Sequence, residues 1–542
     1  MPMTASPKPA SDMSSSPVSP VPREGPVGPN PVPGDDLEHS ARRGAVFIPM
    51  AKLWFMLSAF LLQVALPRVL ASPALYGLFV LVSSWFSTLN NVLVTGTIQT
   101  VAYFAARGPL AVEEAKRTAL KMNLWLGGGA TILFCVLAPA IAHFEHDTEL
   151  IEPLRAGSLI VLLYSFYSVF VGAANGARQF HKQAGLDIVF ATLRVGFLLA
   201  FAYVTHSVLW AVLGWAVAAV VILFVAVAVV GMPKRTPGKG APIAVRTMLA
   251  FGAGLSLYLL SQNALLFLDG WWLKRLYSEA LSHLSVVEQK RIVDGMVGVY
   301  GAAQTVARLP YQLVLAVTFV VFPLLSAPAL KEDPERAQRY VRATLRYSLI
   351  GAVGMCLALS ARPHATLSLL FPPEYAVGSR ALHMLLWAYV CLSLFSIVGT
   401  IANSLGRVRD TVILGFVALV LTSVSVYFSI RSALLVGAQP LRATAFGMLL
   451  GLGASVVLGL MYLWNTLRVT IPAKSVLRVA LCGGAVLWVA PHFPLAGKVG
   501  ALAGSVVFFV AYFALLFASR ELSISELLAS RNPGQKTNST RS

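Results

Sequence analysis

Residues 208–231 read VLWAVLGWAVAAVVILFVAVAVVG, a run that contains no charged side chain. An α-helix of about 20 apolar residues is long enough to cross a hydrocarbon core that is about 30 Å thick. Similar apolar runs recur along the whole chain, so a single anchor on a soluble domain does not explain them. The pattern predicts an all-α polytopic membrane protein.

The composition supports the same fold class. The chain has 542 residues, of which 57% are hydrophobic and 12% are charged. Soluble domains carry roughly 25% charged residues, and a globular surface could not hide so much apolar side chain. The net charge of +19 would favour nucleic-acid binding in a soluble protein, but here the bases lie in short connections between apolar runs. We therefore predict the lipid bilayer, and no nucleic acid, as a partner.

We predict about fourteen transmembrane helices, arranged as two six-helix bundles in parallel pseudo-repeat plus two C-terminal helices. The predicted spans are 46–68, 74–98, 122–142, 154–174, 186–205, 208–231, 247–272, 296–323, 345–368, 379–405, 410–433, 441–466, 475–491 and 496–518. The predicted domains are a disordered cytoplasmic tail (1–44), an N-terminal six-helix bundle (45–231), a cytoplasmic linker (232–246), a C-terminal six-helix bundle (247–470), two extra transmembrane helices (471–519) and a cytoplasmic tail (520–542).

The Lys and Arg residues of the connections predict the orientation. Connections after even-numbered spans carry about 20 of them, and connections after odd-numbered spans about 11. Because short cytoplasmic loops are enriched in bases, both termini are predicted to be cytoplasmic. The connection after the third span is acidic instead, with Glu145, Asp147, Glu149 and Glu152, and we interpret it as a solvated outer loop.

Two connections that are predicted to be cytoplasmic resemble each other. The fourth span ends in GAANGAR at 172–178 and the tenth ends in TIANSLGR at 400–407, and an acid follows each, Asp187 and Asp410. An even number of spans separates them, so two halves related in this way would share one orientation, as in transporters with parallel repeats. Chance is the alternative, because Ala, Asn, Gly and Arg are common at such helix ends.

The eighth predicted span carries a polar stripe. Tyr300, Gln304, Arg308 and Gln312 recur every four residues, which places them on one helix face, and Pro310 should kink the helix. The seventh span adds Gln262 and Asp269, which share a face because they are seven residues apart. We interpret the stripe as the lining of a hydrated cavity and Asp269 with Gln262 as ion-coupling groups. The alternative is a structural role, in which Asp269 pairs with Arg308 or polar side chains join neighbouring helices.

The first and second predicted spans supply the other candidate binding residues. Lys52 and Gln63 lie near one face of the first span, Arg68 ends it, and Asn91 belongs to a polar stripe on the second. The resulting cavity would be cationic on balance. Since the planar guanidinium of arginine donates two hydrogen bonds to a phosphate, a pyrophosphate-linked lipid suits this cavity better than a cationic drug.

Enzyme signatures are absent from the sequence. It contains no phosphate-cradling Gly-Lys loop, no HExxH and no nucleophile elbow, so we predict that the chain is not an enzyme and has no cofactor, metal included. A membrane-embedded polymerase or glycosyltransferase would also need a larger loop or an extra domain.

Several short segments resemble the polysaccharide-flippase branch of the multidrug/oligosaccharidyl-lipid/polysaccharide exporter superfamily. These segments are PALYGLF at 73–79, GTIQT at 96–100, GVYGAA at 298–303, Leu309-Pro310, FPLLS at 322–326, FPPEYA at 371–376 and ANSLGR at 402–407. The family's cationic cavity maps only onto Arg308, Arg68 and Lys52, and no dense arginine cluster like that of the superfamily's lipid II flippases is present.

The resemblance implies a flippase that carries an undecaprenyl-pyrophosphate-linked oligosaccharide across the bacterial cytoplasmic (inner) membrane by alternating access. A proton or sodium gradient, or the membrane potential, would drive it, and polysaccharide polymerase or glycosyltransferases would be its partners. Two alternatives stay open: a multidrug or cation exporter of the same fold, and a membrane polysaccharide polymerase or glycosyltransferase.

Overall fold

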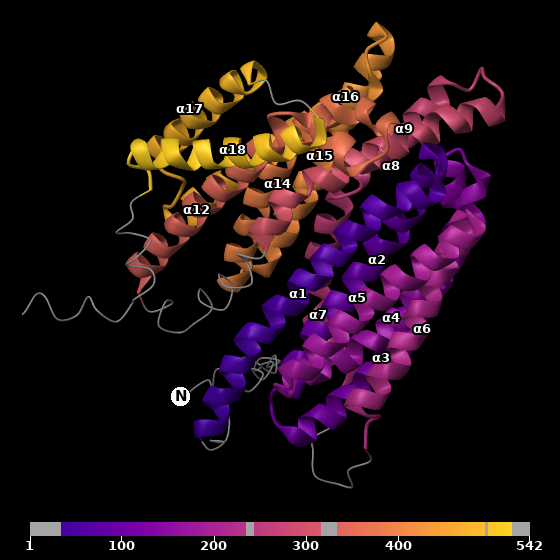
Figure 1. Cartoon of the computed structure of the whole chain (residues 1–542). Coiled ribbons are helices and arrows are strands. Elements are labelled where there is room, and N and C mark those ends of the chain that lie inside the picture. The colour runs from indigo at the N-terminus through magenta and orange to yellow at the C-terminus, as the bar shows by residue number, and fades with distance from the viewer. Residues whose placement is uncertain (1–33, 235–242, 316–332, 494–496, 523–542) are drawn as a thin grey trace, which may run out of the picture.

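The computed structural model describes residues 34–234, 243–315, 333–493 and 497–522 (Figure 1). Within these ranges every regular element is helical and no strand is present. The first group of helices is α1 Gly34–Leu70, α2 Pro73–Ala105, α3 Pro109–Phe144, η1 Thr148–Leu150, α4 Ile151–Gly176, α5 Phe180–Thr205 and α6 Val208–Val230. The second group is α7 Val245–Leu265, α8 Leu268–Ala280, α9 Val286–Ala307, α12 Pro334–Ser360, α13 Pro363–Leu370, η2 Pro373–Gly378, α14 Ser379–Ser404, α15 Val408–Val436, α16 Pro440–Leu467, α17 Ala473–Val489, η3 Ala490–His492 and α18 Gly497–Ala518.

Twelve helices of the described ranges are long and apolar enough to cross a membrane. They coincide with the predicted spans except the eighth and the fourteenth. At the eighth, α9 ends at Ala307, helix resumes at residues 309–315, and the FPLLS segment at 322–326 lies outside the described residues. At the fourteenth, the apolar part of α18 is the shorter helix Leu502–Ala518. The structure therefore confirms an all-helical multi-pass protein, with twelve rather than about fourteen such helices among the described residues.

Helix α1 begins earlier than the predicted first span. It starts at Gly34, within the stretch predicted as a tail, and residues 1–33 lie outside the described residues. A membrane helix can extend beyond the hydrocarbon into water, where its polar residues are compatible with helix. The apolar part that could span the membrane is Met50–Leu70.

The helices form two groups that meet along α2. In the first group α1 packs on α5, α5 on α6, and α4 on α2, α3 and α6, and these helices run roughly alongside one another in Figure 1. In the second group α14 packs on α12 and α16, α15 packs on α16, and α18 packs on α12. Helix α2 contacts α7 and α9 of the second group, so it lies at the contact between the two groups.

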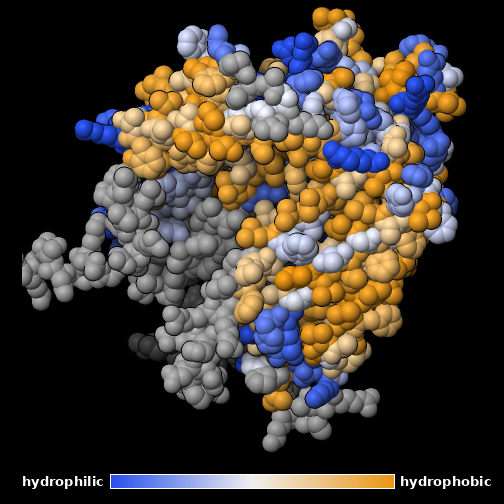
Figure 2. Space-filling view, viewed as in Figure 1, coloured by the Kyte–Doolittle hydropathy of each residue, from blue (hydrophilic) through white to orange (hydrophobic). Residues whose placement is uncertain are grey.

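The outer surface of the helices is apolar where lipid would contact it. Trp125 is 81% exposed and Leu435 is 88% exposed, which would be unfavourable for many side chains at once in water. Figure 2 shows broad hydrophobic surfaces along the helices, with hydrophilic residues gathered near the ends of the molecule. This distribution is that of a membrane protein.

The two similar turns identified in the sequence have the same backbone structure. Each closes its helix with a Schellman pair of hydrogen bonds around a residue of positive φ, which is Arg178 (57°) in one and Gly406 (78°) in the other. The bonds are Arg178 N–Asn175 O and Gln179 N–Ala174 O in the first turn, and Gly406 N–Asn403 O and Arg407 N–Ala402 O in the second. The two turns are thus similar both in sequence and in backbone geometry.

Candidate functional site

The candidate site is built around a break in the seventh predicted span. Helix α7 ends at Leu265 and α8 begins at Leu268, so the span consists of two helices instead of one. The break frees backbone groups that a continuous helix would have used internally. One of them, the carbonyl of Leu266, accepts a hydrogen bond from Nη2 of Arg308 at 2.5 Å.

Asp269 lies in the first turn of α8 and is fully buried. Its carboxylate accepts hydrogen bonds from the Tyr300 hydroxyl at 2.7 Å and from Nε2 of Gln304 at 2.8 Å. The backbone N–H of Gly270 adds a third donor at 3.0 Å. Since Tyr300 and Gln304 are one helical turn apart on α9, the four-residue period of the stripe directs both toward the same carboxylate.

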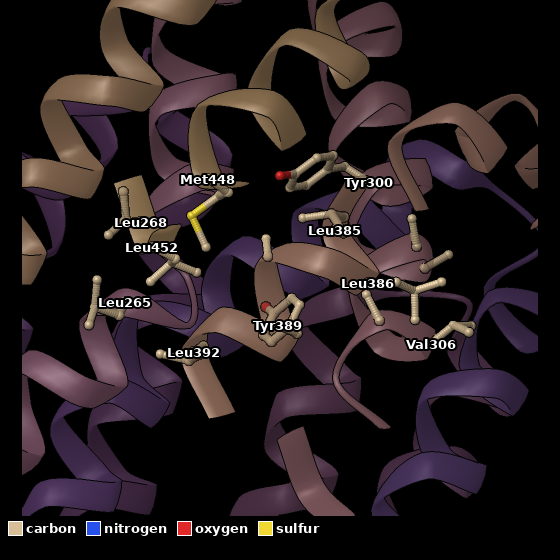
Figure 3. Packing of buried hydrophobic residues seen from close by; sticks show 14 of the residues in the cluster. Leu265, Leu268, Tyr300, Val306, Leu385, Leu386, Tyr389, Leu392, Met448 and Leu452 are labelled. Carbon is tan, nitrogen blue, oxygen red and sulfur yellow. The ribbon is translucent and has the colours of Figure 1, made fainter. Parts of the chain in front are cut away.

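Arg308 occupies the point where α9 ends. Its Nε donates to the Tyr389 hydroxyl on α14 at 3.0 Å, and its guanidinium lies 4.7 Å from the centre of the Phe267 ring. Figure 3 shows Tyr300 and Tyr389 among buried leucines of α14, so this polar network lies inside an apolar cluster. Arg308 as a whole residue is half-buried.

The structure differs from the sequence-based prediction in two respects: what Tyr300 and Gln304 contact, and how Asp269 lies relative to Arg308. Tyr300 and Gln304 are buried and bonded to Asp269, so they do not line an open space in this conformation. No ion pair joins Asp269 to Arg308 within the described ranges, because neutral donors from α9 satisfy the carboxylate and Arg308 is directed to Leu266 and Tyr389. Gln312 follows on the next turn and is half-buried.

Gln262 faces a different partner from Asp269. Its Nε2 donates to the Tyr258 hydroxyl at 3.1 Å, and its Oε1 accepts a long bond from Ser396 at 3.5 Å. The break at residues 266–267 separates the two side chains that a continuous helix would have placed on one face. Gln262 and Asp269, which were predicted to share a helix face, thus have different partners in this conformation.

The candidate binding residues of α1 each have a different partner and do not form one cluster. Lys52 forms an ion pair with Asp187 on α5 at 2.8 Å. Gln63 accepts a hydrogen bond from the Tyr76 hydroxyl at 2.9 Å, and Tyr76 packs edge-on against Tyr375 of the second group. Arg68 is exposed and bonds only a backbone carbonyl of its own helix at 2.7 Å.

Asn91 lies at the contact between α2 and α7. Its Nδ2 donates to Oδ1 of Asn263 at 2.9 Å, although Asn91 itself is exposed on one side. Nearby, a Cβ on Gly96 would approach Ser256 Oγ to 2.8 Å, so the two helices pack closely. In this conformation the interaction joins α2 to α7.

Helices α2 and α9 approach each other closely where α2 begins, and we call this region the α2–α9 end. A Cβ built on Gly77 would lie 2.0 Å from the carbonyl oxygen of Asp294, and one built on Gly298 would lie 2.0 Å from that of Pro73. Only glycine permits such contact between backbones. The GVYGAA and PALYGLF segments are therefore packed directly on each other.

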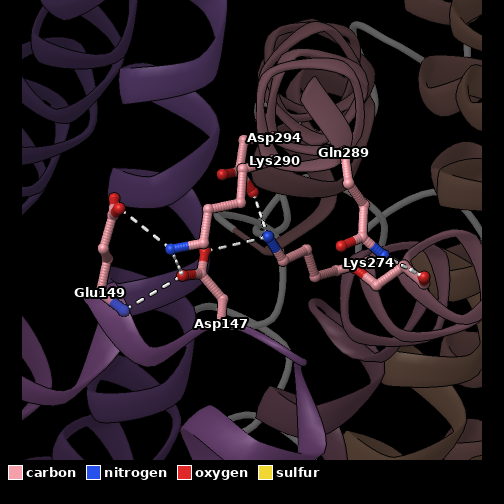
Figure 4. A network of polar contacts seen from close by, with 7 residues as sticks. Asp147, Glu149, Lys274, Gln289, Lys290 and Asp294 are labelled. Atoms are coloured by element: carbon pink, nitrogen blue, oxygen red, sulfur yellow. Dashed lines mark hydrogen bonds and ion pairs between the residues drawn. The ribbon is translucent and has the colours of Figure 1, made fainter. Parts of the chain in front are cut away.

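An ion cluster covers the same end, and sequence reasoning missed it. We define it as Asp147, Glu149, Lys274, Lys290 and Asp294 (Figure 4). Asp147 pairs with Lys274 at 3.0 Å and with Lys290 at 2.8 Å, Glu149 pairs with Lys290 at 2.9 Å, and Lys274 also pairs with Asp294.

The structure corrects in part the interpretation of the acidic connection as a solvated loop: Glu149 and Glu152 are exposed, whereas the other two acids are buried. Glu145 is 0% exposed and Asp147 is 2% exposed. The physical reason for the burial of Asp147 is that Lys274 of α8 and Lys290 of α9 both pair with it. The signal in the sequence was the coincidence of an acidic connection and a basic one on the same predicted side.

All-helical membrane transporters have apolar spans, and a carboxylate buried inside them usually has a function. Many also contain broken helices and two helix groups that contact each other. The chain belongs to the polysaccharide biosynthesis protein family, whose model matches residues 41–327. The chain is thus a multi-pass membrane transporter of that family. No curated protein matches it by sequence comparison.

Solved structures share the fold at low identity. The chain is similar to the lipid II flippase MurJ in its inward closed conformation, at 12% identity over 88% of this chain and 99% of that one, with a TM-score of 0.68. An inward-facing multidrug resistance MATE family transporter of the MOP superfamily gives 15% identity over 77% and 94%, with a TM-score of 0.57. An outward-facing one gives 17% over 78% and 95%, with a TM-score of 0.55.

Proposed function

We propose that this protein is a flippase that moves an undecaprenyl-pyrophosphate-linked oligosaccharide from the inner to the outer leaflet of the bacterial inner membrane. The observation that carries the proposal is an arginine, Arg308, whose guanidinium is held at a helix break inside the membrane protein by Tyr389 and Leu266. Membership in the polysaccharide biosynthesis family and a fold similar to that of a lipid II flippase support this cargo class.

The proposed architecture is fourteen spans in two six-helix bundles plus two C-terminal helices. Its domains are the ranges predicted above, 45–231 and 247–470 for the bundles and 471–519 for the extra helices, with both termini in the cytoplasm. The matched Schellman turns after α4 and α14 support a parallel repeat, because they occupy the corresponding position in each half.

In the proposed cycle the α2–α9 end is the outer gate. The ion cluster and the backbone contact at Gly77 close it here, so cargo would enter from the other side. Opening this end and closing the opposite one would expose the same cavity to the outer leaflet, which is alternating access.

Arg308 would bind the pyrophosphate through the part of its guanidinium that is not committed to Tyr389 and Leu266. Arg68 and Lys52 would add positive charge along α1. Gln63 and Asn91 would contact the cargo in states where their present partners separate, and Gln312 would contact it from the helical turn that follows Arg308.

Asp269 would couple flipping to a proton or sodium gradient, and Gln262 would assist from α7. Support comes from its full burial and its three donors, since a buried carboxylate inside a membrane protein is costly and usually functional. Tyr300 and Gln304 would hold this carboxylate and release it to the cavity when α9 moves.

The test is flipping of an undecaprenyl-pyrophosphate-linked oligosaccharide by purified protein in liposomes. We expect Arg308→Ala to reduce the flipping rate at least tenfold. We expect Arg308→Lys to retain part of that rate, because lysine keeps the positive charge but lacks the planar guanidinium that donates two hydrogen bonds. Arg155→Ala, which removes an exposed arginine paired only with a neighbouring acid on its own helix, is the matched control. Normal flipping by Arg308→Ala would refute the proposed binding role.

The same liposomes distinguish the second candidate. A multidrug exporter of the related MATE fold would transport a cationic dye and leave the lipid-linked oligosaccharide in place. We expect the reverse, and we expect polysaccharide polymerase or glycosyltransferases to act before and after this step in the same membrane.

A further inference from the structure

Glu145 is a fully buried carboxyl group at the α2–α9 end, between α3 and η1. Its Oε1 accepts a hydrogen bond from the indole N–H of Trp85 on α2 at 3.0 Å. Its Oε2 is buried and has no hydrogen-bond partner in the part of the chain that the structure describes. A carboxylate in this position would carry a buried charge with only one donor, so the protonated form is favoured.

The neighbouring cations do not pair with Glu145 because they are engaged elsewhere. Lys274 is bonded to Asp147 and Asp294 within the ion cluster. Arg275 donates to the backbone carbonyl of Phe144 at 2.7 Å, and its guanidinium lies 4.4 Å from the centre of the Phe144 ring. These contacts hold the charges of Lys274 and Arg275 near Glu145, but neither side chain donates a hydrogen bond to its carboxyl group.

The surroundings of Glu145 come from both helix groups. Trp85 of α2, which bonds its carboxyl group, stacks on Trp271 of α8 with ring centres 4.2 Å apart. The Trp271 indole donates in turn to Ser84 at 2.7 Å. Because α8 covers the Trp85 side, separating the two groups at this end would admit water to Glu145.

We propose that Glu145 is a proton-binding site of the contact between the two helix groups: it holds a proton while the α2–α9 end is closed and releases it as that end opens. The inference deepens the proposed function, on which it rests, by assigning a proton ligand to the outer gate. It concerns a different carboxylate from Asp269.

The charged groups around Glu145 decide the pH at which it would titrate. Burial raises the pKa of Glu145 to about 8, and Asp147 adds to the rise, whereas the Trp85 hydrogen bond and the charges of Lys274 and Arg275 oppose it. Because the pKa of Glu145 is higher in the closed state than in the open state, its stabilisation of the closed contact is complete below the open-state pKa and is lost as pH rises from there through the closed-state pKa. Each unit of pKa difference between closed and open states changes their ratio tenfold.

Other titratable groups lie at the same end, and Glu145→Gln separates their contribution from that of Glu145. Burial and Arg275 lower the pKa of His146, and burial raises that of Asp294 to about 6 against the attraction of Lys274. Lys274 and Lys290 keep raised pKa values, because their bonds to acids exceed the effect of burial. Two more groups, His143 and Glu279, lie beside His146.

The test measures the opening of this end directly, without cargo. The full chain in lipid nanodiscs, with its four cysteines replaced, carries spin labels at the exposed positions Val204 and Val287, one in each helix group. Pulsed electron-spin resonance then gives the distance distribution from about pH 4 to about pH 9.5. We expect the short-distance population to decrease as pH rises between 4.5, the ordinary pKa of a glutamate in water, and about 8, and to change no further at higher pH.

Three variants complete the experiment. Glu145→Gln, which cannot release a proton, should remain closed at every pH. Glu152→Gln, a change of an exposed acid in the first turn of α4, should keep the pH dependence of the unmodified chain. Trp85→Phe removes a bond that lowers the pKa of Glu145, so the decrease should extend to higher pH, and this variant decides the question if Glu145→Gln does not fold.

A pH-independent distance in the unmodified chain, or an unchanged pH dependence in Glu145→Gln, would overturn the inference. These outcomes are separable from failure of the proposed function. A chain that opens with pH through Glu145 but does not flip lipid-linked oligosaccharide supports this inference and contradicts the cargo. A chain that flips the cargo but shows no pH-dependent opening supports the proposed function and contradicts this inference.

Discussion

Replacing Gly77 by alanine should open the α2–α9 end. The added Cβ would lie 2.0 Å from the carbonyl oxygen of Asp294 and 2.8 Å from the amide nitrogen of Gly298. Ordinary contact begins at 3.4 Å, so the helices must separate by roughly 1.4 Å. Both obstructing atoms belong to the backbone, and no change of rotamer can relieve the clash.

The size of the effect follows from the cost of overpacking. Adding a methyl group to a well-packed contact costs about 1–3 kcal/mol when the backbone must shift. If the open state has no such contact, the whole cost appears in the equilibrium between closed and open forms. The ratio of closed to open molecules should therefore fall by about 5- to 150-fold.

The assay is the same distance measurement between labels at Val204 and Val287, at a fixed pH of about 7. Gly196→Ala is the matched control, because nothing lies within 4 Å of the Cβ that it would add on α5. We expect Gly77→Ala to populate the long distance and Gly196→Ala to retain the short one.

A short distance in a folded Gly77→Ala protein would refute the reasoning. That result would mean that α2 and α9 separate locally while the two helix groups remain together. The contact at Gly77 would then be a local packing feature and not part of a gate.

Three further predictions follow from buried charges. Asp269→Asn should fold normally but lose any increase of flipping rate with an imposed proton or sodium gradient; an unchanged gradient dependence in liposomes would contradict the coupling role. Lys274→Met should destabilise the protein by about 3–5 kcal/mol in chemical unfolding, because it leaves the buried Asp294 without its cation and Asp147 with Lys290 alone, and unfolding at the unmodified midpoint would argue against it. Burial opposes ionisation of Asp147, but Lys274 and Lys290 outweigh it and lower its pKa below 3.8. Its contribution should thus be complete above that pH and be lost on further acidification, which thermal unfolding at low pH would reveal.

Part of the candidate site could be predicted from the sequence. The stripe of Tyr300, Gln304 and Arg308 depends only on helical periodicity, and the structure indeed directs Tyr300 and Gln304 to one carboxylate. The identity of that carboxylate, Asp269, was among the candidates because a charge inside an apolar span is rare.

The partners of the remaining candidates could not be predicted. Tyr389, which accepts from Arg308, is far away in the chain, and no local pattern distinguishes it from other tyrosines. Lys52 was assigned to a cavity, yet it pairs with Asp187 across a helix contact that the sequence did not specify.

By itself the sequence determined the fold class, the position of most spans and the spacing of polar side chains along them. These properties are local, since hydrophobic length and helical period are set by consecutive residues. Only the tertiary structure decided that an acidic connection is buried against α8 and α9, and that a helix break separates Gln262 from Asp269. Burial and ion pairing depend on which helices meet, and that choice is a property of the whole packed chain.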